Sequence, residues 1–197
     1  ISLNNVNVEL GNSGTAYITM GSAAVRDLFD IASGAISLSD GYGASDGLDA
    51  ANTGVFGGGR NTASATPFNT MDYITISTTG NATDFGDLTV ARMFPSGCAS
   101  STRGVFGGGT DSAALQTVLD YITIATVGNA TDFGDLSFVS NNGAALASST
   151  RGVWGGDSNS TQYITIATTG NASYFGDLST SRSGPGSVAS STRGVFA

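Results

Sequence analysis

The sequence has no histidine, no lysine and only one cysteine, and each absence excludes a class of function. Without histidine, the chain cannot build Ser-His-Asp or Cys-His nucleophile systems, or a histidine-based metal site. Without lysine, it cannot contain the GxxxxGK phosphate-binding loop. Cys98 has no second cysteine to pair with inside the chain, so we expect a small, buried apolar residue at this position.

Charge is also scarce, and most of it is negative. Charged residues make up 11% of the chain, against about 25% in average domains, and the formal net charge is −8. An acidic surface repels phosphate, so we expect neither nucleic-acid binding nor adhesion to a membrane. No apolar run approaches the roughly 18 residues of a membrane span. The chain begins with Ile1 and shows no signal-peptide pattern, and we expect it to be a segment of a longer gene product.

The sequence is instead rich in glycine and in internal repeats. Three short motifs recur: Tyr-Ile-Thr-Ile from Tyr73, Tyr121 and Tyr163, Gly-Asn-Ala from Gly80, Gly128 and Gly170, and Gly-Val-Phe or Gly-Val-Trp from Gly54, Gly104, Gly152 and Gly194. Each Tyr lies 7 residues before the Gly-Asn-Ala, which lies 24 residues before the next Gly-Val-Phe/Trp. Only the stretch from Gly-Val-Phe/Trp to the following Tyr varies, with 19, 17 and 11 residues. This pattern predicts a rigid scaffold with one adjustable loop per unit.

Each unit is predicted to hold four short strands. Tyr-Ile-Thr-Ile alternates large apolar residues with Thr, which suits a half-buried strand. The other three candidates are Asp-Phe-Gly-Asp-Leu, a stretch of small residues such as "GCASS", and "TRGVFGGG", where glycines allow close backbone approach. Four strands in a unit of about 40–50 residues are typical of a β-propeller blade. We therefore predict a mainly β fold with three four-stranded repeats, at about 54–103, 104–151 and 152–197.

These motifs carry a resemblance to known families. From Arg92, the run "R-x(4)-GCASSTRGVFGGG" followed by "DYITI" resembles a kelch blade, and the likeness extends from about Gly47 to Ala197. The Trp of many kelch blades is replaced by the Phe of Asp-Phe-Gly-Asp-Leu. The text "YITIATTGNATDFGDL" is similar to tandem repeats in tail-fibre and other virion proteins of tailed bacteriophages, especially marine ones. The resemblance implies kelch-like β-propeller blades in a virion structural protein.

Residues 1–46 do not carry the repeat. "TAYITM" predicts a strand, and Ser22 is a suitable N-cap for a helix over "AAVRDLFDIAS" that Gly34 would end. We therefore predict a small α+β module, and its pattern resembles modules found before fibre or appendage domains in phage structural proteins. Because it is too small to be stable easily on its own, we expect it to pack on the propeller or on another virion protein. Residues 43–52 are predicted to form a linker.

The repeated polar residues admit a structural and a chemical interpretation. Paired acids such as Asp84 and Asp87 could serve glycoside hydrolysis or calcium binding, but acids that recur in every unit favour turn-stabilising bonds to the backbone after each Gly. Repeated arginines such as Arg92 and Arg103 favour bonds to carbonyls or to the repeated Asp. The triple glycines favour strand packing over a phosphate cradle, and the Asn-Ala-Thr/Ser sites favour turn chemistry over glycosylation.

The variable loops are the remaining candidates for ligand binding. If the fold is right, they rise on one face and offer aromatic, amide and carboxylate groups that suit glycans or proteins; the alternative is that they are tolerated surface insertions. The candidate residues are Arg60, Asn61, Phe68, Asn69, Asp111, Gln116, Asp157, Asn159 and Gln162.

From these features we predict a non-enzymatic bacteriophage structural or tail-fibre protein on the surface of the virion, with a displayed repeat domain for host attachment. We expect no catalytic residue, metal or cofactor. The expected partners are other virion proteins, a host-surface glycan or protein, and further copies of the chain. The resemblance to phage appendages, which are often trimers, favours a trimer, and identical partial propellers could close a ring by symmetry. Two alternatives stay open: a carbohydrate-active enzyme on a propeller scaffold, and a secreted lectin-like protein.

Overall fold

Thirteen strands arranged in four antiparallel sheets make up the part of the chain described by a computed structural model, residues 48–156 and 158–197. The prediction of a mainly β fold is confirmed for these residues. The predicted N-terminal module at 1–46 lies outside them. No helix within the described ranges is long and apolar enough to cross a membrane.

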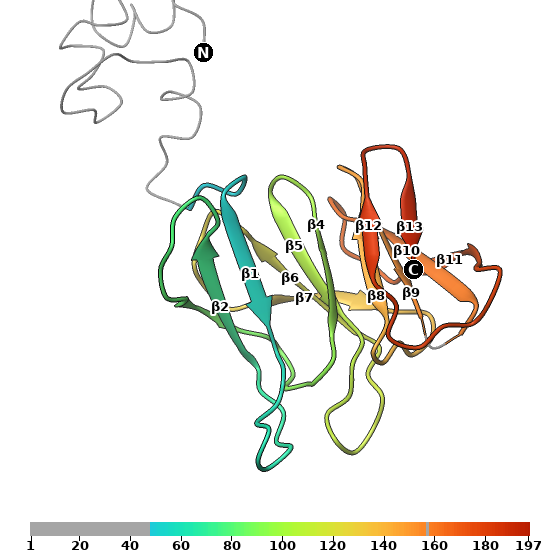
Figure 1. Cartoon of the computed structure of the whole chain (residues 1–197), viewed down its shortest axis with the longest axis horizontal. Helices are drawn as coiled ribbons and strands as arrows, with labels where there is room; N and C mark the ends of the chain where they lie inside the picture. Colours follow the sequence, from blue (N-terminus) through green and yellow to red (C-terminus); the bar gives the residue numbers. More distant parts are fainter. Residues whose placement is uncertain (1–47, 157) are drawn as a thin grey trace, which may run out of the picture. The chain divides into compact units, whose positions relative to one another are not determined.

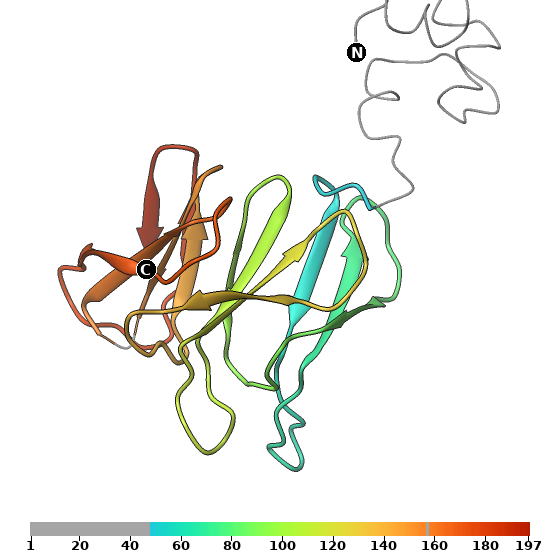
Figure 2. The same cartoon turned by 180° about the vertical axis from the view of Figure 1, so that it is seen from behind.

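The sheets follow one another in chain order and lie side by side (Figures 1 and 2). The first sheet has the order β1 (Thr53–Gly57), β2 (Thr70–Thr75), β3 (Thr83–Asp87). The second has the order β4 (Ser96–Ala99), β5 (Arg103–Gly107), β6 (Val118–Thr123), β7 (Thr131–Asp135). The third has the order β8 (Ala144–Ala147), β9 (Arg151–Gly155), β10 (Ser160–Thr165), β11 (Ser173–Asp177). The fourth pairs β12 (Ser187–Ala189) with β13 (Gly194–Phe196).

The sheets are offset by one strand from the predicted units. A complete sheet begins with the small-residue strand, because β4 and β8 pair with the Gly-Val-Phe/Trp strands that follow them. The predicted units instead begin at Gly54, Gly104 and Gly152. Only the second and third sheets have four strands. Within residues 48–156 and 158–197, the first sheet has no small-residue strand, and the fourth has only its small-residue and Gly-Val-Phe strands.

The Tyr-Ile-Thr strands also begin earlier than the motif. Strand β6 runs from Val118 to Thr123, so the predicted strand from Tyr121 onward is wrong in its bounds. The chain leaves the strand after Thr123 because the Thr126 N–H turns back to the Thr123 carbonyl, 3.0 Å away. A bulge between Leu119 and Asp120 shifts the pairing with β7. It faces Gly134, whose φ of +136° favours glycine.

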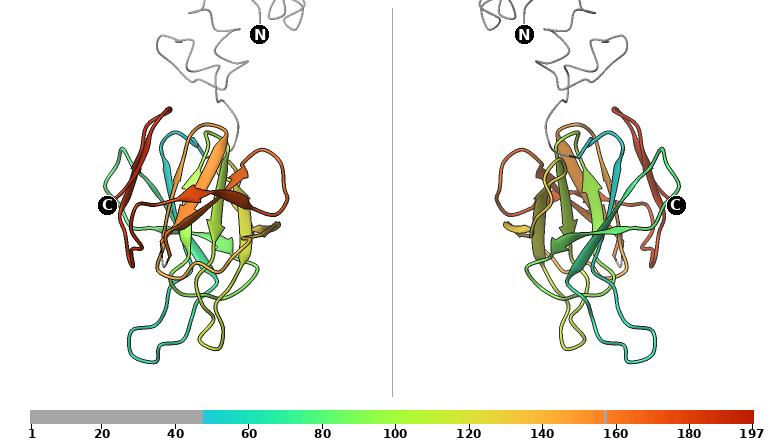
Figure 3. Two further views of the ribbon diagram at one scale, coloured as in Figure 1. Left: turned by 90° about the vertical axis from the view of Figure 1, so that its right-hand side faces the viewer. Right: turned by 90° about the vertical axis from the view of Figure 1, so that its left-hand side faces the viewer.

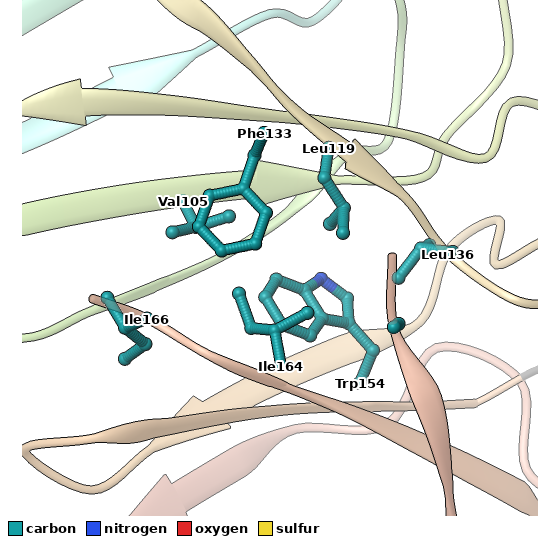
Figure 4. Close-up of a cluster of buried hydrophobic side chains, with 8 residues drawn as sticks. Val105, Leu119, Phe133, Leu136, Trp154, Ile164 and Ile166 are labelled. Atoms are coloured by element: carbon teal, nitrogen blue, oxygen red, sulfur yellow. The ribbon is translucent and has the colours of Figure 1, made fainter. Parts of the chain in front are cut away.

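Two apolar clusters hold neighbouring sheets together rather than filling a single sheet. The first lies between the first and second sheets and comprises Met71, Phe85, Leu88, Phe106, Ile122 and Ile124. The second lies between the second and third sheets and comprises Val105, Leu119, Phe133, Leu136, Trp154, Ile164, Ile166 and Ala172 (Figure 4). The side views of Figure 3 look along the row of sheets and show them one behind another. Each sheet therefore depends on its neighbour for burial of its apolar residues.

The segment just before the first sheet is packed rather than free. The Leu48 N–H donates to the Ala125 carbonyl at 2.8 Å, and the Leu48 side chain packs on the first cluster. The Asn52 side chain bonds both the backbone and the hydroxyl of Ser77. The prediction of a linker over 43–52 is therefore wrong for its described residues, because Leu48 can bury its side chain against the second sheet.

Candidate functional site

Two loops extend past the same end of the sheets (Figures 1 and 2). One joins β1 to β2 over residues 58–69, and the other joins β5 to β6 over residues 108–117. These are two of the three loops that vary in length between the repeats. Their position confirms that at least these two rise together.

A segment between the first two sheets links the two loops. The Gly59 N–H donates to the Arg92 carbonyl at 2.9 Å, which ties the first loop to this segment. Met93 and Thr110 exchange two backbone hydrogen bonds of 2.8 and 2.9 Å, which tie the second loop to it. Phe94 is therefore held between the loops, with a φ of +59° and 41% of its surface exposed. Such a backbone conformation is uncommon for a bulky residue and is kept only where its surroundings enforce it.

Arg60 and Phe94 form a contact at this end of the molecule. The Arg60 guanidinium carbon lies 5.3 Å from the centre of the Phe94 ring, within the range of a cation–π interaction. Phe68, on the same loop as Arg60, is also exposed. Its carbonyl accepts from the Arg92 N–H at 3.0 Å, so its backbone is fixed to the same segment. A cation and two aromatic rings are thus presented on hydrogen-bonded backbone.

Two of the predicted site residues shape the loops with their side chains. Asn61 Oδ1 accepts from the N–H groups of Ala63 and Ser64, at 2.8 and 3.2 Å. Asp111 Oδ1 accepts from the two equivalent N–H groups in the second loop, at 2.9 and 2.8 Å. Bonds of this kind are the usual way in which Asn and Asp stabilise turns. In Asp111 these bonds lower the pKa of the carboxyl, those from Ala114 and Ala113 contributing most, so the carboxylate form is favoured.

The other predicted residues are less suited to a common site. Gln116 turns its amide towards the Ala114 carbonyl of its own loop, 3.4 Å away, and Asn69 is half-buried. Asn159 is exposed on the third loop, and Asp157 lies outside the described residues. Gln162 lies in β10 and is fully buried. Its amide accepts from the Ser137 N–H and hydroxyl and donates to the Phe138 carbonyl. Its prediction as a loop ligand is therefore wrong.

Phe94 and Leu115 belong to this end of the molecule but were missed by the sequence analysis. Leu115 is 48% exposed and pairs with Thr110 within the second loop. Phe94 stands in the stretch between two units, where the other two connections have Asn142 and Gly184 at the same position. An exposed aromatic residue present at only one of the three connections was the available signal.

The triple glycines do not form a phosphate cradle. The N–H groups of Gly58 and Gly59 donate to Thr70 and Arg92 carbonyls, and those of Gly108 and Gly109 donate to Val118 and Ser140 carbonyls. These donors are consumed within the protein. A Cβ on Gly108 would lie 2.2 Å from the Ser140 carbonyl oxygen, so close backbone packing requires this glycine. The interpretation of the glycines as packing residues is confirmed.

The repeated arginines act within the scaffold. Arg103 lies 4.3 Å from the Tyr121 ring centre and donates to the Ile166 carbonyl of the third sheet at 2.8 Å. Arg92 forms a buried ion pair with Asp120 at 2.7 Å and donates to the Phe106 carbonyl at 3.3 Å. The structural interpretation of these two arginines is confirmed.

The repeated acids and Asn residues make other contacts than predicted. Asp84 Oδ1, before the Gly, accepts from the Gly86 N–H at 3.2 Å, whereas Asp135, after its Gly, accepts from the Thr117 hydroxyl at 3.0 Å. Asn129 accepts from the Asp87 N–H of the preceding sheet at 3.0 Å, so it bonds across sheets rather than within a turn. Among the described residues, no three His, Cys, Asp or Glu side chains come together as a metal site requires.

A separate groove of about 300 Å³ lies between the third and fourth sheets, away from the predicted loop residues. Its walls include Leu146, Arg151, Val153, Phe175 and Gly194. A comparison with protein-family models found no match for the chain, and a comparison with curated proteins found none either.

Proposed function

We propose that this chain is a non-enzymatic structural protein of a bacteriophage virion, in which repeated sheets present loops to the host surface. The literal similarity of its repeats to those of tail-fibre and other virion proteins supports this role. Its localisation is then the particle surface, and its partners are other virion proteins together with a host glycan or protein. The 1–46 segment supplies the attachment to the particle.

The finer fold within this proposal is a kelch-like β-propeller. Strand β8 lies against both β4 and β12, so the small-residue strands of successive sheets are neighbours. Strands with small side chains are suited to the crowded centre around which blades are arranged. Four-stranded antiparallel sheets joined by short connections are the units of such a ring.

One observation carries the binding part of the proposal: the Arg60–Phe94 contact lies beside exposed Phe68 on tied-down loops. An aromatic face next to a cation suits sugar rings and protein side chains, which combine apolar faces with polar edges. A rigid backbone keeps the ordering cost of binding small. We favour a host-surface polysaccharide as the ligand.

Binding of the purified protein to polysaccharide from host cells tests this role. We expect Phe94→Ala and Phe68→Ala each to weaken binding about tenfold, as truncation of an aromatic anchor commonly costs more than 1 kcal/mol. Val127→Ala is the matched control, because Val127 is an exposed apolar residue in the turn between β6 and β7. Unchanged binding in both aromatic variants contradicts the loop site.

Two further measurements test the rest of the proposal. Antibodies raised against the chain should label the surface of phage particles in electron micrographs, and unlabelled particles would contradict the virion location. Incubation with the same polysaccharide should release no new reducing ends. Their release would favour the alternative of a carbohydrate-active enzyme.

A further inference from the structure

The junctions between the first and second sheets and between the second and third sheets share their apolar contacts and their backbone hydrogen bonds. We call the side of a sheet that faces the preceding sheet its leading face, and the opposite side its trailing face. The leading face carries the aromatic residue of the Gly-Val-Phe/Trp strand, the two Ile residues of Tyr-Ile-Thr-Ile and the Gly-Asn-Ala segment. The trailing face carries the Phe and Leu of Phe-Gly-Asp-Leu. The two apolar clusters are these two faces in contact.

Backbone pairing at the first junction joins Gly-Asn-Ala to the edge of β3. The N–H groups of Gly128 and Ala130 donate to the carbonyls of Phe85 and Asp87, both at 2.8 Å. The Asn129 side chain accepts from the Asp87 N–H at 3.0 Å. The second junction repeats all three bonds. Gly170 and Ala172 donate to Phe133 and Asp135 at 2.7 Å each, and Asn171 accepts from Asp135 at 3.0 Å.

Aromatic packing is repeated in the same way. At the first junction the Phe106 ring lies against Gly57, where an added Cβ would come within 3.1 Å of it. At the second, the Trp154 ring lies against Gly107, with a corresponding distance of 2.9 Å. At the boundary with the fourth sheet, the Phe196 ring lies against Gly155 at 3.3 Å. Each of these glycines leaves the space in which the aromatic side chain of the next sheet packs.

A charged pair adds specificity to the first junction. Arg92 follows the Phe-Gly-Asp-Leu motif of the first sheet, and Asp120 precedes the Tyr of the second. Their side chains form the buried ion pair between the two sheets. At the second junction the same two positions hold Ser140 and Gln162, which are neutral, and Gln162 bonds the segment just after Leu136.

The first sheet has a leading face with nothing against it among the described residues. Phe56, the equivalent of Phe106, is 62% exposed, and Ile76, the equivalent of Ile124, is 63% exposed. Asp72, the equivalent of Asp120, is exposed as well. The Gly-Asn-Ala segment at Gly80–Ala82 is also exposed.

The third sheet has a trailing face that is only partly covered. Phe175 is 52% exposed, whereas its equivalents Phe85 and Phe133 are buried. Its groove of about 300 Å³ lies where the Ile residues of a following sheet would fit. Arg182, the equivalent of Arg92, has a buried Nε with no hydrogen-bond partner in the described part of the chain. This face thus offers the partner positions that the leading face of the first sheet lacks.

We propose that the first sheet of one copy of this chain docks on the trailing face of the third sheet of a second copy. Asp72 then pairs with Arg182 as Asp120 pairs with Arg92, and Asn81 accepts from the Asp177 N–H as Asn129 accepts from Asp87. Ile76 enters the groove. The Asn bond is one that the chain already makes at both junctions, and the Asp–Arg pair is one that it makes at the first. The proposed contact does not depend on the proposed function.

The fourth sheet explains how the junction is completed. For this contact, the Phe56 ring of one copy must pack against Gly155 of the other copy, in the position that Phe196 occupies in the single chain. Strand β1 of the first copy therefore replaces β13 of the second. Both strands contain Gly-Val-Phe, so the exchange replaces one strand with another of the same sequence. Strand β13 is short and mostly exposed, so little buried contact is lost when it leaves. Strand β12 then pairs with β1 and supplies the small-residue strand that the first sheet lacks. Exchange of an identical element between copies is a low-cost route to an oligomer.

The number of sheets favours two copies. The described residues of each copy contribute three sheets after the exchange, so these sheets of two copies make a ring of six, within the range of about four to eight found in propellers. The trimer predicted from the sequence would make nine. The structure therefore favours a dimer as the closed form of this head-to-tail contact.

Charge reversal tests the junction with matched partners. The wild-type chain should be a dimer by light scattering. D72R and R182D should each associate at least tenfold more weakly, because each places like charges in contact. Mixing the two variants should restore the dimer, since both junctions of the mixed pair then join Arg to Asp. Circular dichroism checks that each variant is folded.

Amide hydrogen exchange of the wild-type chain gives an independent measurement. The amides of Gly80, Ala82 and Asp177 should gain protection as the protein concentration is raised, as those amides become bonded across the junction. A wild-type monomer at its highest soluble concentration overturns the proposal, and so do folded D72R and R182D chains that keep the wild-type mass. Failure of the mixture to restore the mass also overturns it. None of these outcomes bears on glycan binding.

Discussion

Removing one partner of the Arg92–Asp120 pair should destabilise the protein strongly. Both side chains are fully buried, and Arg92 Nη2 lies 2.7 Å from Asp120 Oδ2. Burial lowers the pKa of Arg92, while the Asp120 carboxylate raises it in opposition, and the guanidinium stays charged. Arg92→Met leaves the Asp120 carboxylate buried with the Thr89 hydroxyl as its remaining hydrogen-bond donor.

The expected magnitude follows from that uncompensated charge. Breaking a buried ion pair by removing one partner costs about 3–5 kcal/mol, a large part of the roughly 5–15 kcal/mol that stabilises a typical domain. Arg92 Nε and Nη1 have no partner among the described residues, so the intact pair repays its desolvation only in part. Removing both charges with R92M/D120L is therefore expected to be neutral or stabilising by about 1–4 kcal/mol.

Urea unfolding followed by circular dichroism measures these differences. With an m-value of about 2 kcal/mol per M, a loss of about 4 kcal/mol lowers the midpoint by about 2 M. Hydrogen exchange should place the loss first in the β1–β3 sheet, because that sheet has only this junction inside the described chain.

The chain supplies its own control for this experiment. The second junction has Ser140 and Gln162 at the same positions, so R92S/D120Q copies the two neutral residues that the fold already accepts there. This double variant should stay close to wild type while R92M falls well below it. If R92M and D120L each lose less than about 1 kcal/mol, or if their effects simply add in the double variant, the reasoning from uncompensated charge is refuted.

Three further predictions concern single sites. Gly108→Ala should lower stability by about 2 kcal/mol or more, since its φ is +71° and the new Cβ would meet the Ser140 carbonyl, whereas Gly128→Ala, with open space at its Cβ, should leave the melting temperature nearly unchanged. Burial raises the pKa of the half-buried Cys98 thiol to about 12, so iodoacetamide at pH 8 should label the native protein much more slowly than the denatured protein, and equally rapid labelling of both would contradict this. The lowered pKa of Asp111 means that its contribution to stability is present above the ordinary carboxyl pKa of 3.8 and is lost as pH falls through the folded-state value. Wild type should therefore lose more stability than Asp111→Ala between neutral and acid pH, and equal losses in urea titrations would contradict the assignment.

Many of the strands and close backbone contacts could be predicted, because the motifs that form them recur in the sequence. Alternating Tyr-Ile-Thr-Ile and glycine at fixed spacing predict short strands and close backbone approach, and Gly108 fulfils that role. The grouping of strands could not be read in the same way, because a repeat can be cut at any strand. Pairing partners such as those of β4 decide where a sheet begins, and short sequences of small residues such as "GCASS" do not specify them.

The sequence predicted where the loop site lies, but not which residues form it. Variation in length marked the loops that contain Arg60 and Phe68. Phe94 was missed because a connection between sheets gave no pattern, and it reaches the loops only through backbone bonds to neighbouring segments. Gln162 was wrongly assigned to the loop because the sequence did not show that β10 begins at Ser160, before Gln162. Asn129 was misread as a turn residue because its partner lies 42 residues earlier in the sequence.

Phe106 and Trp154 are each buried against the preceding sheet, so during synthesis the sheets can pack on one another in order from the N-terminal side. The cluster around Met71 can close once Phe106, Ile122 and Ile124 have been added, but Leu119 becomes buried only when Trp154 is present, which is translated 35 residues later. During translation the newest sheet seals the older one while its own trailing face is still open. If the ribosome pauses between two repeats, the nascent chain therefore exposes an apolar face and an unpaired strand edge. The length of the pause determines how long chaperones or neighbouring nascent chains can bind this surface.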